Sequence, residues 1–181
     1  MAGALIKIDE FTVSSAVASV TLGGGSSGSS GLNASIDSTY DVYQVVINNI
    51  DVDTDAATSR LRVTVGGSAD STSNYDQAAK VFITSGFGNS AGANLDRIDF
   101  HSQGTGTGEQ TNAIFYLFNF HNSSEYSFVT VETTAYDSFA RLVGRAGGFV
   151  HTVAQSCDGV EFSLSSGNYT SGTFTLYGLK K

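Results

Sequence analysis

Apolar and polar residues alternate along most of the chain, and this period of two predicts β-strands. In residues 40–50 one face of the predicted strand carries apolar side chains and the other is mixed, namely Tyr43, Val45 and Ile47 against Gln44, Val46 and Asn48. The last stretch, residues 167–181, makes a Gly/Asn/Ser turn and then alternates again. There Phe174 and Leu176 lie opposite Thr173, Thr175 and Tyr177. A strand so close to a terminus frays unless it is paired and packed, so we expect it to close the fold.

Similar patterns predict further strands at residues 4–20 (one or two short strands), 60–65, 95–100, 113–120, 126–136, 138–143, 149–155 and 160–164. Residues 77–83 fit a strand or a short helix capped by Asp76. Residues 66–76 and 86–94 are predicted loops, and residues 40–50 and 60–65 are predicted to form an antiparallel pair. About nine or ten strands with at most one helix indicate a sandwich or barrel.

The fold prediction is therefore all-β, a single-domain, jelly-roll-like antiparallel β-sandwich, since eight principal strands in two sheets is the jelly-roll count. Residues 1–39 are predicted to hold the N-terminal strands and a Gly/Ser-rich arm, and residues 40–181 the sandwich domain. The arm, residues 23–31, reads GGGSSGSSG and has the composition of a flexible linker. A neighbouring subunit is the expected contact of this arm, because it has no apolar side chains to bury.

Charge restricts the partners of this chain. Its 181 residues include nine Lys and Arg against seventeen Asp and Glu, a net charge of −8. Binding to phosphate backbones depends on clustered basic residues, and here they are scattered apart from Arg141 and Arg145. Nucleic acid and anionic membrane are therefore excluded as primary partners. No segment has the pattern of a transmembrane helix or a signal peptide, which predicts a protein assembled in the cytoplasm.

Asp51, Asp53 and Asp55 resemble the start of a calcium-binding loop. An EF-hand loop needs Gly at its sixth position and Glu at its twelfth, where this chain has Ala56 and Arg62. A solvated acidic turn is the favoured interpretation, and a calcium site of another type is left open.

The three histidines, His101, His121 and His151, could in principle meet as metal ligands. None has a short-spaced His, Cys or carboxylate partner, which zinc sites usually show. We interpret them as polar residues of the surface or of an interface, and leave open an ion held on the axis of a trimer.

No arrangement of residues predicts catalysis. The chain lacks a Gly-x-Ser-x-Gly elbow, and its Gly-rich residues 104–108 lack the Lys and Ser or Thr of a phosphate loop. Neither carboxylate pair has the setting of a glycosidase site, namely Asp9 with Glu10 and Asp96 with Asp99. The single cysteine, Cys157, is interpreted as a small, partly buried apolar residue. We predict no enzyme, no cofactor, and no catalytic or metal-binding residues.

Twelve Phe and eight Tyr make the chain rich in aromatic residues, although it has no Trp. Tyr75, Tyr136 and Tyr169 fall in expected loops, where they could stack on sugars. Tyrosines at the edge of a core or at a subunit interface are the more common case.

Residues 171–179, SGTFTLYGL, resemble the ending of many small structural proteins of tailed bacteriophages, which reads S-G-T-hydrophobic-x-L-Y-G-hydrophobic. Tyr40, Asp41 and Tyr43, then Arg60 and Arg62, and the strand at 160–164 fit the same pattern. The resemblance implies a virion β-sandwich that assembles as a homotrimer.

A head decoration or cement protein on the capsid exterior is the expected role. Fibres have long shafts of coiled coil, collagen-like repeat or β-helix, and this sequence has none. An acidic surface suits the outside of a DNA-filled shell. The expected partners are other copies of the chain and the major capsid protein, with the Gly/Ser arm and the N-terminal strand in contact. The alternative is a tail fibre, a receptor-binding protein or a lectin-like domain that binds host glycans.

Overall fold

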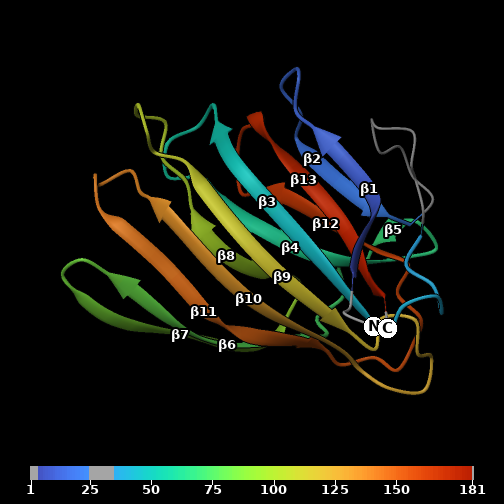
Figure 1. The fold of residues 1–181 in the computed structure, drawn as a ribbon. Coiled ribbons are helices and arrows are strands. Elements are labelled where there is room, and N and C mark those ends of the chain that lie inside the picture. The colour runs from blue at the N-terminus through green and yellow to red at the C-terminus, as the bar shows by residue number, and fades with distance from the viewer. Residues whose placement is uncertain (1–3, 25–34, 181) are drawn as a thin grey trace.

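The computed structural model describes residues 4–24 and 35–180, which fold into two antiparallel β-sheets packed face to face (Figure 1). The large sheet has the strand order β1–β13–β3–β9–β10–β11–β6–β7, and the small sheet has the order β2–β12–β4–β5, with β8 also paired to β4. The strands are β1 (Ala4–Thr12), β2 (Ser19–Gly23), β3 (Val42–Val52), β4 (Thr58–Val65), β5 (Ser68–Ala69), β6 (Tyr75–Ile83), β7 (Gly86–Leu95), β8 (Ile98–Ser102), β9 (Thr111–Phe118), β10 (Ser127–Tyr136), β11 (Leu142–His151), β12 (Gly159–Leu164) and β13 (Tyr169–Lys180).

The predicted β-sandwich is confirmed, with strands distributed differently from the eight principal strands of a jelly roll. One sheet has eight strands and the other five. The jelly-roll assignment therefore stays a prediction. None of the described residues forms a helix with the length and apolarity needed to cross a membrane.

The C-terminal strand β13 is paired on both sides, as its sequence pattern predicts. It lies between β1 and β3, with Ala4 opposite Lys180 at one end of the β1 pairing. Phe174 and Leu176 are completely buried. The two ends of the described chain consequently lie side by side (Figure 1).

Aromatic side chains fill the space between the two sheets. Phe162 on β12 has its ring 5.4 Å from that of Phe115 on β9 and 5.5 Å from that of Phe174 on β13, measured between ring centroids. Phe100 on β8 packs edge-on against Phe115 at 5.2 Å. Aromatic rings prefer such tilted and edge-to-face contacts, so this cluster joins both sheets through favourable geometry as well as burial.

Several local predictions are wrong. Strands β3 and β4 do not form the predicted pair, because β3 joins the large sheet and β4 the small one. Residues 86–94 are not a loop but most of strand β7, which pairs with β6 throughout. Residues 75–83 form a strand, which confirms the strand alternative for residues 77–83 and leaves no helix for Asp76 to cap. The expected strands 138–143 and 149–155 are instead a turn followed by one strand, β11. The predicted loop at 66–76 contains the short strand β5.

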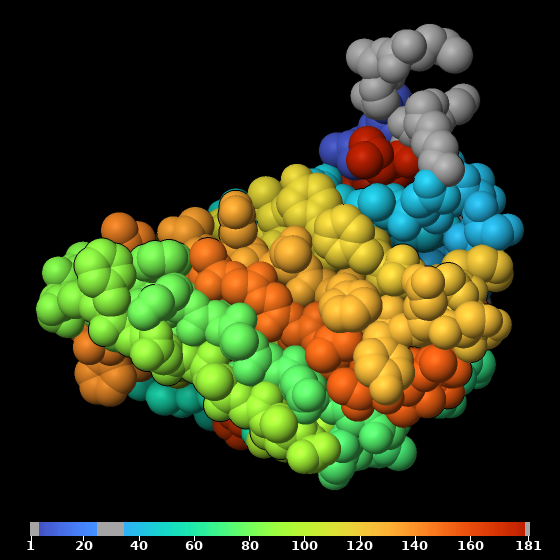
Figure 2. All heavy atoms as spheres, turned by 90° about the horizontal axis from the view of Figure 1, so that it is seen from below, coloured from blue at the N-terminus to red at the C-terminus, as the bar shows by residue number. Residues whose placement is uncertain are grey.

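The large sheet extends past the small one at the edge formed by β6 and β7. We call these two strands, residues 75–95, the overhang. Figure 2 shows them as the green projection at one end of the molecule, beside the orange of β11. Tyr75 is their only buried residue. The overhang is therefore accessible on both of its faces.

Candidate interaction surface

The side of the large sheet that faces away from the core carries two groups of exposed apolar side chains, which together we call the outer face. Strand alternation and pairing register place all of them on one side of five neighbouring strands, with Phe128 and Tyr136 at opposite ends of β10. They are Ile114 and Tyr116 of β9, Phe128 and Tyr136 of β10, Leu142 of β11, Phe82 of β6 and Phe87 of β7. Each is between 37% and 82% exposed, so the described part of the chain leaves these side chains uncovered.

Strand β11 forms a shallow trough across the outer face because its outward residues there are small. Gly144, Ala146 and Gly148 point outward, and Gly148 lies opposite Ala78 of β6. Hollows of about 320 and 380 Å³ open along this strip, the first beside Phe82 and Leu142 and the second beside Phe128. A third hollow, of about 300 Å³, lies at the β3–β9–β10 side, beside Ile114. Small residues flanked by large apolar ones can receive the side chains of a partner.

Two opposite charges flank the trough. The register places Glu132 of β10 and Lys80 of β6 on either side of Ala146 in one row across the sheet. Lys80 donates a hydrogen bond to Asn89 Oδ1 at 2.6 Å and stays exposed. Protein interfaces commonly combine an apolar centre with a few such charges, which set the orientation of the partner.

The edge of the large sheet at β7 is long and lacks the usual protection. Its sequence, GFGNSAGANL, contains no charged residue and no proline. Exposed edge strands normally carry such residues because their free N–H and C=O groups can pair with another strand. Phe87, 82% exposed, stands at this edge with its ring edge-on to Phe82. The outer face therefore continues to an edge that can itself bind protein.

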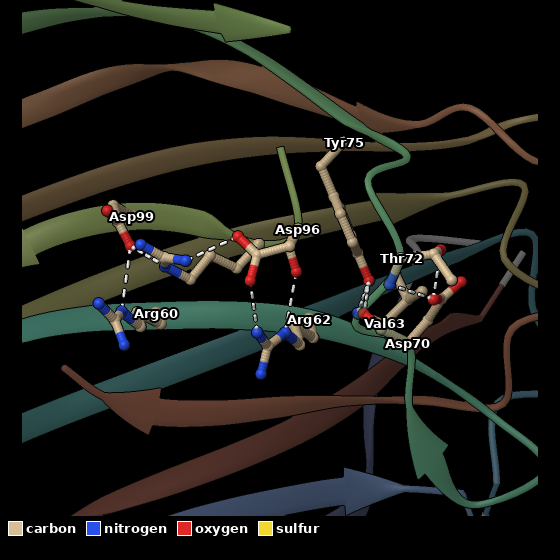
Figure 3. Close-up of polar contacts among 9 residues, drawn as sticks. Arg60, Arg62, Val63, Asp70, Thr72, Tyr75, Asp96 and Asp99 are labelled. Carbon is tan, nitrogen blue, oxygen red and sulfur yellow. Dashed lines mark hydrogen bonds and ion pairs between the residues drawn. The ribbon is translucent and has the colours of Figure 1, made fainter. Parts of the chain in front are cut away.

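Asp96 and Asp99 belong to an ion-pair network at the small sheet (Figure 3). Asp96 accepts hydrogen bonds from Arg62 at 3.0 Å and Arg97 at 2.6 Å. Asp99 pairs with Arg97 at 3.1 Å and with Arg60 at 3.4 Å. Burial works to raise the pKa of Asp96, but the charges of Arg97 and Arg62 and their hydrogen bonds lower it below its usual value. These ion pairs give both carboxylates a structural role at the small sheet.

A second polar group ties the 66–75 segment to the body. The Tyr75 hydroxyl donates to the Asp70 carbonyl at 2.8 Å and accepts from Val63 N–H at 3.2 Å, while Thr72 donates to the Asp70 carboxylate (Figure 3). Burial raises the pKa of Tyr75. His151 Nε2 lies 2.9 Å from Asp70 Oδ2. These contacts explain how a polar, loop-like sequence is held in place.

The acidic turn after β3 does not gather its carboxylates around a common point. Asp51 accepts from Ser171 Oγ at 2.8 Å, and Asp53 accepts from the main chain and side chain of Asn168, both at 2.8 Å. The hydrogen bonds from Asn168 lower the pKa of Asp53. Asp55 is exposed. Within residues 4–24 and 35–180, no three His, Cys, Asp or Glu side chains are placed to hold a metal ion.

The histidines are in three different settings. His121 is exposed, as expected, but His101 and His151 are buried, so the prediction of surface or interface positions is wrong for these two. His101 lies on β8 inside the sandwich edge and His151 at the end of β11. Single histidines in alternating strands carry no sequence signal for burial, because the ring is acceptable on either face.

Two of the tyrosines considered for sugar stacking are core residues. Tyr75 and Tyr169 begin strands β6 and β13 and are completely buried, so neither can stack on a sugar. Burial raises the pKa of Tyr169, whose hydroxyl donates to the Ser163 carbonyl at 2.9 Å. Tyr136 is exposed, but it lies on a strand and belongs to the outer face.

The remaining candidates are explained by local packing. Asp9 is completely buried and accepts hydrogen bonds from the N–H groups of Gly23 and Glu10 at 2.9 and 2.8 Å. Cys157 is completely buried, beyond the partial burial predicted, and burial raises its pKa to about 11. Residues 104–108 form a loop. Of the Gly/Ser arm, only Gly23 and Gly24 are described; residues 25–31 lie outside the described residues.

The outer face was largely missed by sequence reasoning. The one available signal was residues 113–120, AIFYLFNF, which are apolar on both faces and indicated either a central strand or an interface. Strand β9 is central, and its second apolar face is exposed. No known family model matches this chain, and no curated protein sequence matches it.

Proposed function

We propose that this chain is a structural virion protein of a tailed bacteriophage, a head decoration or cement protein that binds capsomers as a homotrimer. The outer face of the large sheet is the observation that supports this role most directly. Single exposed apolar residues are ordinary, whereas a group of them on neighbouring strands, such as Tyr136, Leu142 and Phe82, marks a protein-binding surface. The likeness of residues 171–179 to phage structural proteins supplies the particle context.

Neighbouring copies of the chain are the proposed occupant of the outer face. The face lies on a paired β-sheet, so little ordering cost accompanies its binding. In a closed trimer each contact is heterologous, so the face meets a different surface of the next copy. The net charge of −8 favours contact with the exterior of the shell, away from packaged DNA.

A matched pair of variants tests the outer face. Phe128 and Tyr126 are 46% and 47% exposed, but Phe128 belongs to the outer face and Tyr126 to the loop before β10. Phe128→Glu is expected to convert trimers to monomers and to abolish binding to phage heads, since a buried unpaired carboxylate opposes association. Tyr126→Glu should leave both unchanged. Sedimentation equilibrium gives the mass, and co-sedimentation with heads measures binding.

A density map of the whole particle tests the proposed location. The expected result is density for this fold in many copies on the outside of the head, in clusters of three over the capsomers. Density at the tail in few copies would instead support the fibre alternative. A wild-type chain that is monomeric and has no affinity for heads would overturn the proposal.

A further inference from the structure

A small pocket opens on the inner side of the large sheet, next to the overhang. Its volume is about 170 Å³, enough for roughly five water molecules. Its walls come from β6, β8 and β11 and from the turn between β10 and β11. One side is apolar and the other polar. The lining residues are Val81, Ile83, His101, Ser102, Asp137, Arg141, Val143, Gly144 and Arg145.

Arg145 brings a positive charge to this pocket without a carboxylate partner. Its guanidinium donates to the main-chain carbonyl of Asp99, and among the described residues it forms no ion pair within 4 Å. The Asp99 carboxylate is paired with Arg60 and Arg97 instead. Burial lowers the pKa of Arg145, and the nearby charge of Asp99 acts in the opposite direction without cancelling this effect. A partly buried cation of this kind favours an anion beside it.

The other charges in the pocket cancel each other. Asp137 Oδ2 accepts two hydrogen bonds from Arg141, at 3.1 and 2.7 Å, and Oδ1 accepts from the N–H groups of Arg141 and Phe139, both at 3.0 Å. The Asp137 carboxylate is therefore fully occupied by Arg141 and by the turn. The net charge of the lining is that of Arg145.

His101 supplies a second, independent sign of a missing ligand. The residue is 92% buried, since 8% of it is exposed, and its ring Nε2 has no hydrogen-bond partner among the described residues. Buried polar atoms without a partner are uncommon in native proteins and call for an explanation. Burial, and next the charge of Arg145, lower the pKa of His101 to about 4, so its ring is neutral at pH 7.

We propose that this pocket binds a short monocarboxylate, with the carboxylate against Arg145 and His101 and the alkyl chain against Val81, Ile83 and Val143. The ligand carboxylate pairs with the Arg145 guanidinium, because its two coplanar oxygens match the geometry of the guanidinium N–H groups. The three aliphatic side chains suit one or two methylene groups. The ligand is either a free small acid or an acidic side chain of a protein partner, and both present the same chemistry.

NMR of the full-length protein tests the site, with the His101 ring signals as the reporter. Acetate and propionate are expected to shift these signals saturably, and each added methylene should strengthen binding about threefold to fourfold. Bound carboxylate should also raise the pKa of His101 by about one unit, because an opposite charge stabilises the imidazolium. Sodium chloride at equal ionic strength controls for screening, and an equal effect of chloride would overturn the proposal.

Variants test whether binding of the carboxylate depends on this pocket or only on the overall charge of the protein. Arg145→Gln should abolish the saturable shift, and Arg145→Lys, which keeps the charge and serves if the first variant does not fold, should weaken it. Lys80→Gln removes one charge from the outer side of the neighbouring strand and should bind like wild type. Unchanged binding in a folded Arg145 variant would overturn the proposal.

The two sources of carboxylate are distinguished by a second titration with N-acetyl-aspartate amide. Binding at least as strong as that of propionate identifies an acidic side chain of a partner protein. Binding of propionate alone identifies a free small acid. Binding of neither overturns the proposal.

Discussion

The two halves of the large sheet have similar strand pairing, but the small sheet covers the inner side of only one of them. In the half formed by β13, β3 and β9, the inward side chains pack on the small sheet, and Phe174, Ile47 and Phe115 are completely buried. In the overhang the inward side chains Val81 and Ile83 are only half-buried. Hydrogen bonding alone therefore does not distinguish the halves, whereas apolar burial does.

This difference follows from the widths of the two sheets. The small sheet covers the large one from β1 towards β11, and β8 is its last strand beneath β11 and β6. Beyond β8 the overhang is held chiefly by its pairing with β11. Hydrophobic burial is the dominant favourable term in folding, so the overhang should contribute little to stability and remain available for binding.

The largest loss of stability is expected from a substitution in the core of the covered half. Phe162→Ala should lower the free energy of unfolding by about 3–5 kcal/mol, because Phe162 is completely buried between the sheets and contacts the rings of Phe115 and Phe174. Denaturant unfolding followed by fluorescence measures the change. A loss below about 1 kcal/mol would show that the aromatic cluster is not the centre of the core.

A pH titration tests the boundary between the halves, where His101 lies. Its folded pKa of about 4 is below its ordinary value of 6.5, so between these values the unfolded state binds more protons than the folded state. Stability should therefore fall by about 3 kcal/mol as the pH is lowered from 6.5 to 4, at about 1.4 kcal/mol per pKa unit.

His101→Gln should remove most of that slope, and His121→Gln, at an exposed position, should retain it. Below pH 4 a further loss is expected as Asp70 and Asp137 are protonated, since their folded pKa values are lowered. Burial acts against this lowering, which comes from hydrogen bonds of Thr72 and His151 to Asp70 and of Arg141 to Asp137. An unchanged slope in His101→Gln would contradict the assignment.

The close approach of β11 to β6, the first strand of the overhang, requires a glycine at position 147. A Cβ atom at Gly147 would lie 2.5 Å from Ala79 Cα on β6, which is main chain and cannot move aside. Gly147→Ala should therefore destabilise the protein by about 1–3 kcal/mol and speed hydrogen exchange in β6 and β7. Gly88→Ala is the control, because a Cβ there meets only ordinary contact with Val81, at 3.7 Å. Equal effects of both substitutions would show that close approach is not the cause.

The smallest effect is expected at the tip of the overhang. Phe87→Ala makes the same chemical change as Phe162→Ala at a side chain that is 82% exposed. Its free energy of unfolding should stay within about 0.5 kcal/mol of wild type, as for most surface substitutions. Calorimetry can measure both phenylalanine variants under one set of conditions. A loss at Phe87 comparable with that at Phe162 would mean that the overhang is covered in solution.

Alternation was a reliable guide where one face of a strand is buried. It correctly predicted β12 and β13, and the face of β13 that carries Phe174 and Leu176 is the buried one. It failed for β7, whose Gly, Asn, Ser and Ala residues show no contrast because neither face is buried. It also failed for the pairing of β3 with β4, since sequence neighbours need not be sheet neighbours in a sandwich.

The sequence by itself determined the all-β class, most strands and the inward side of strands that alternate clearly, such as β13, because period-two burial is a local property of the chain. Only the tertiary structure decided which strands pair and how far one sheet extends past the other. These depend on contacts between residues far apart in sequence. For the same reason, only the tertiary structure brought Arg145 and His101 to one pocket and left the second apolar side of β9 exposed.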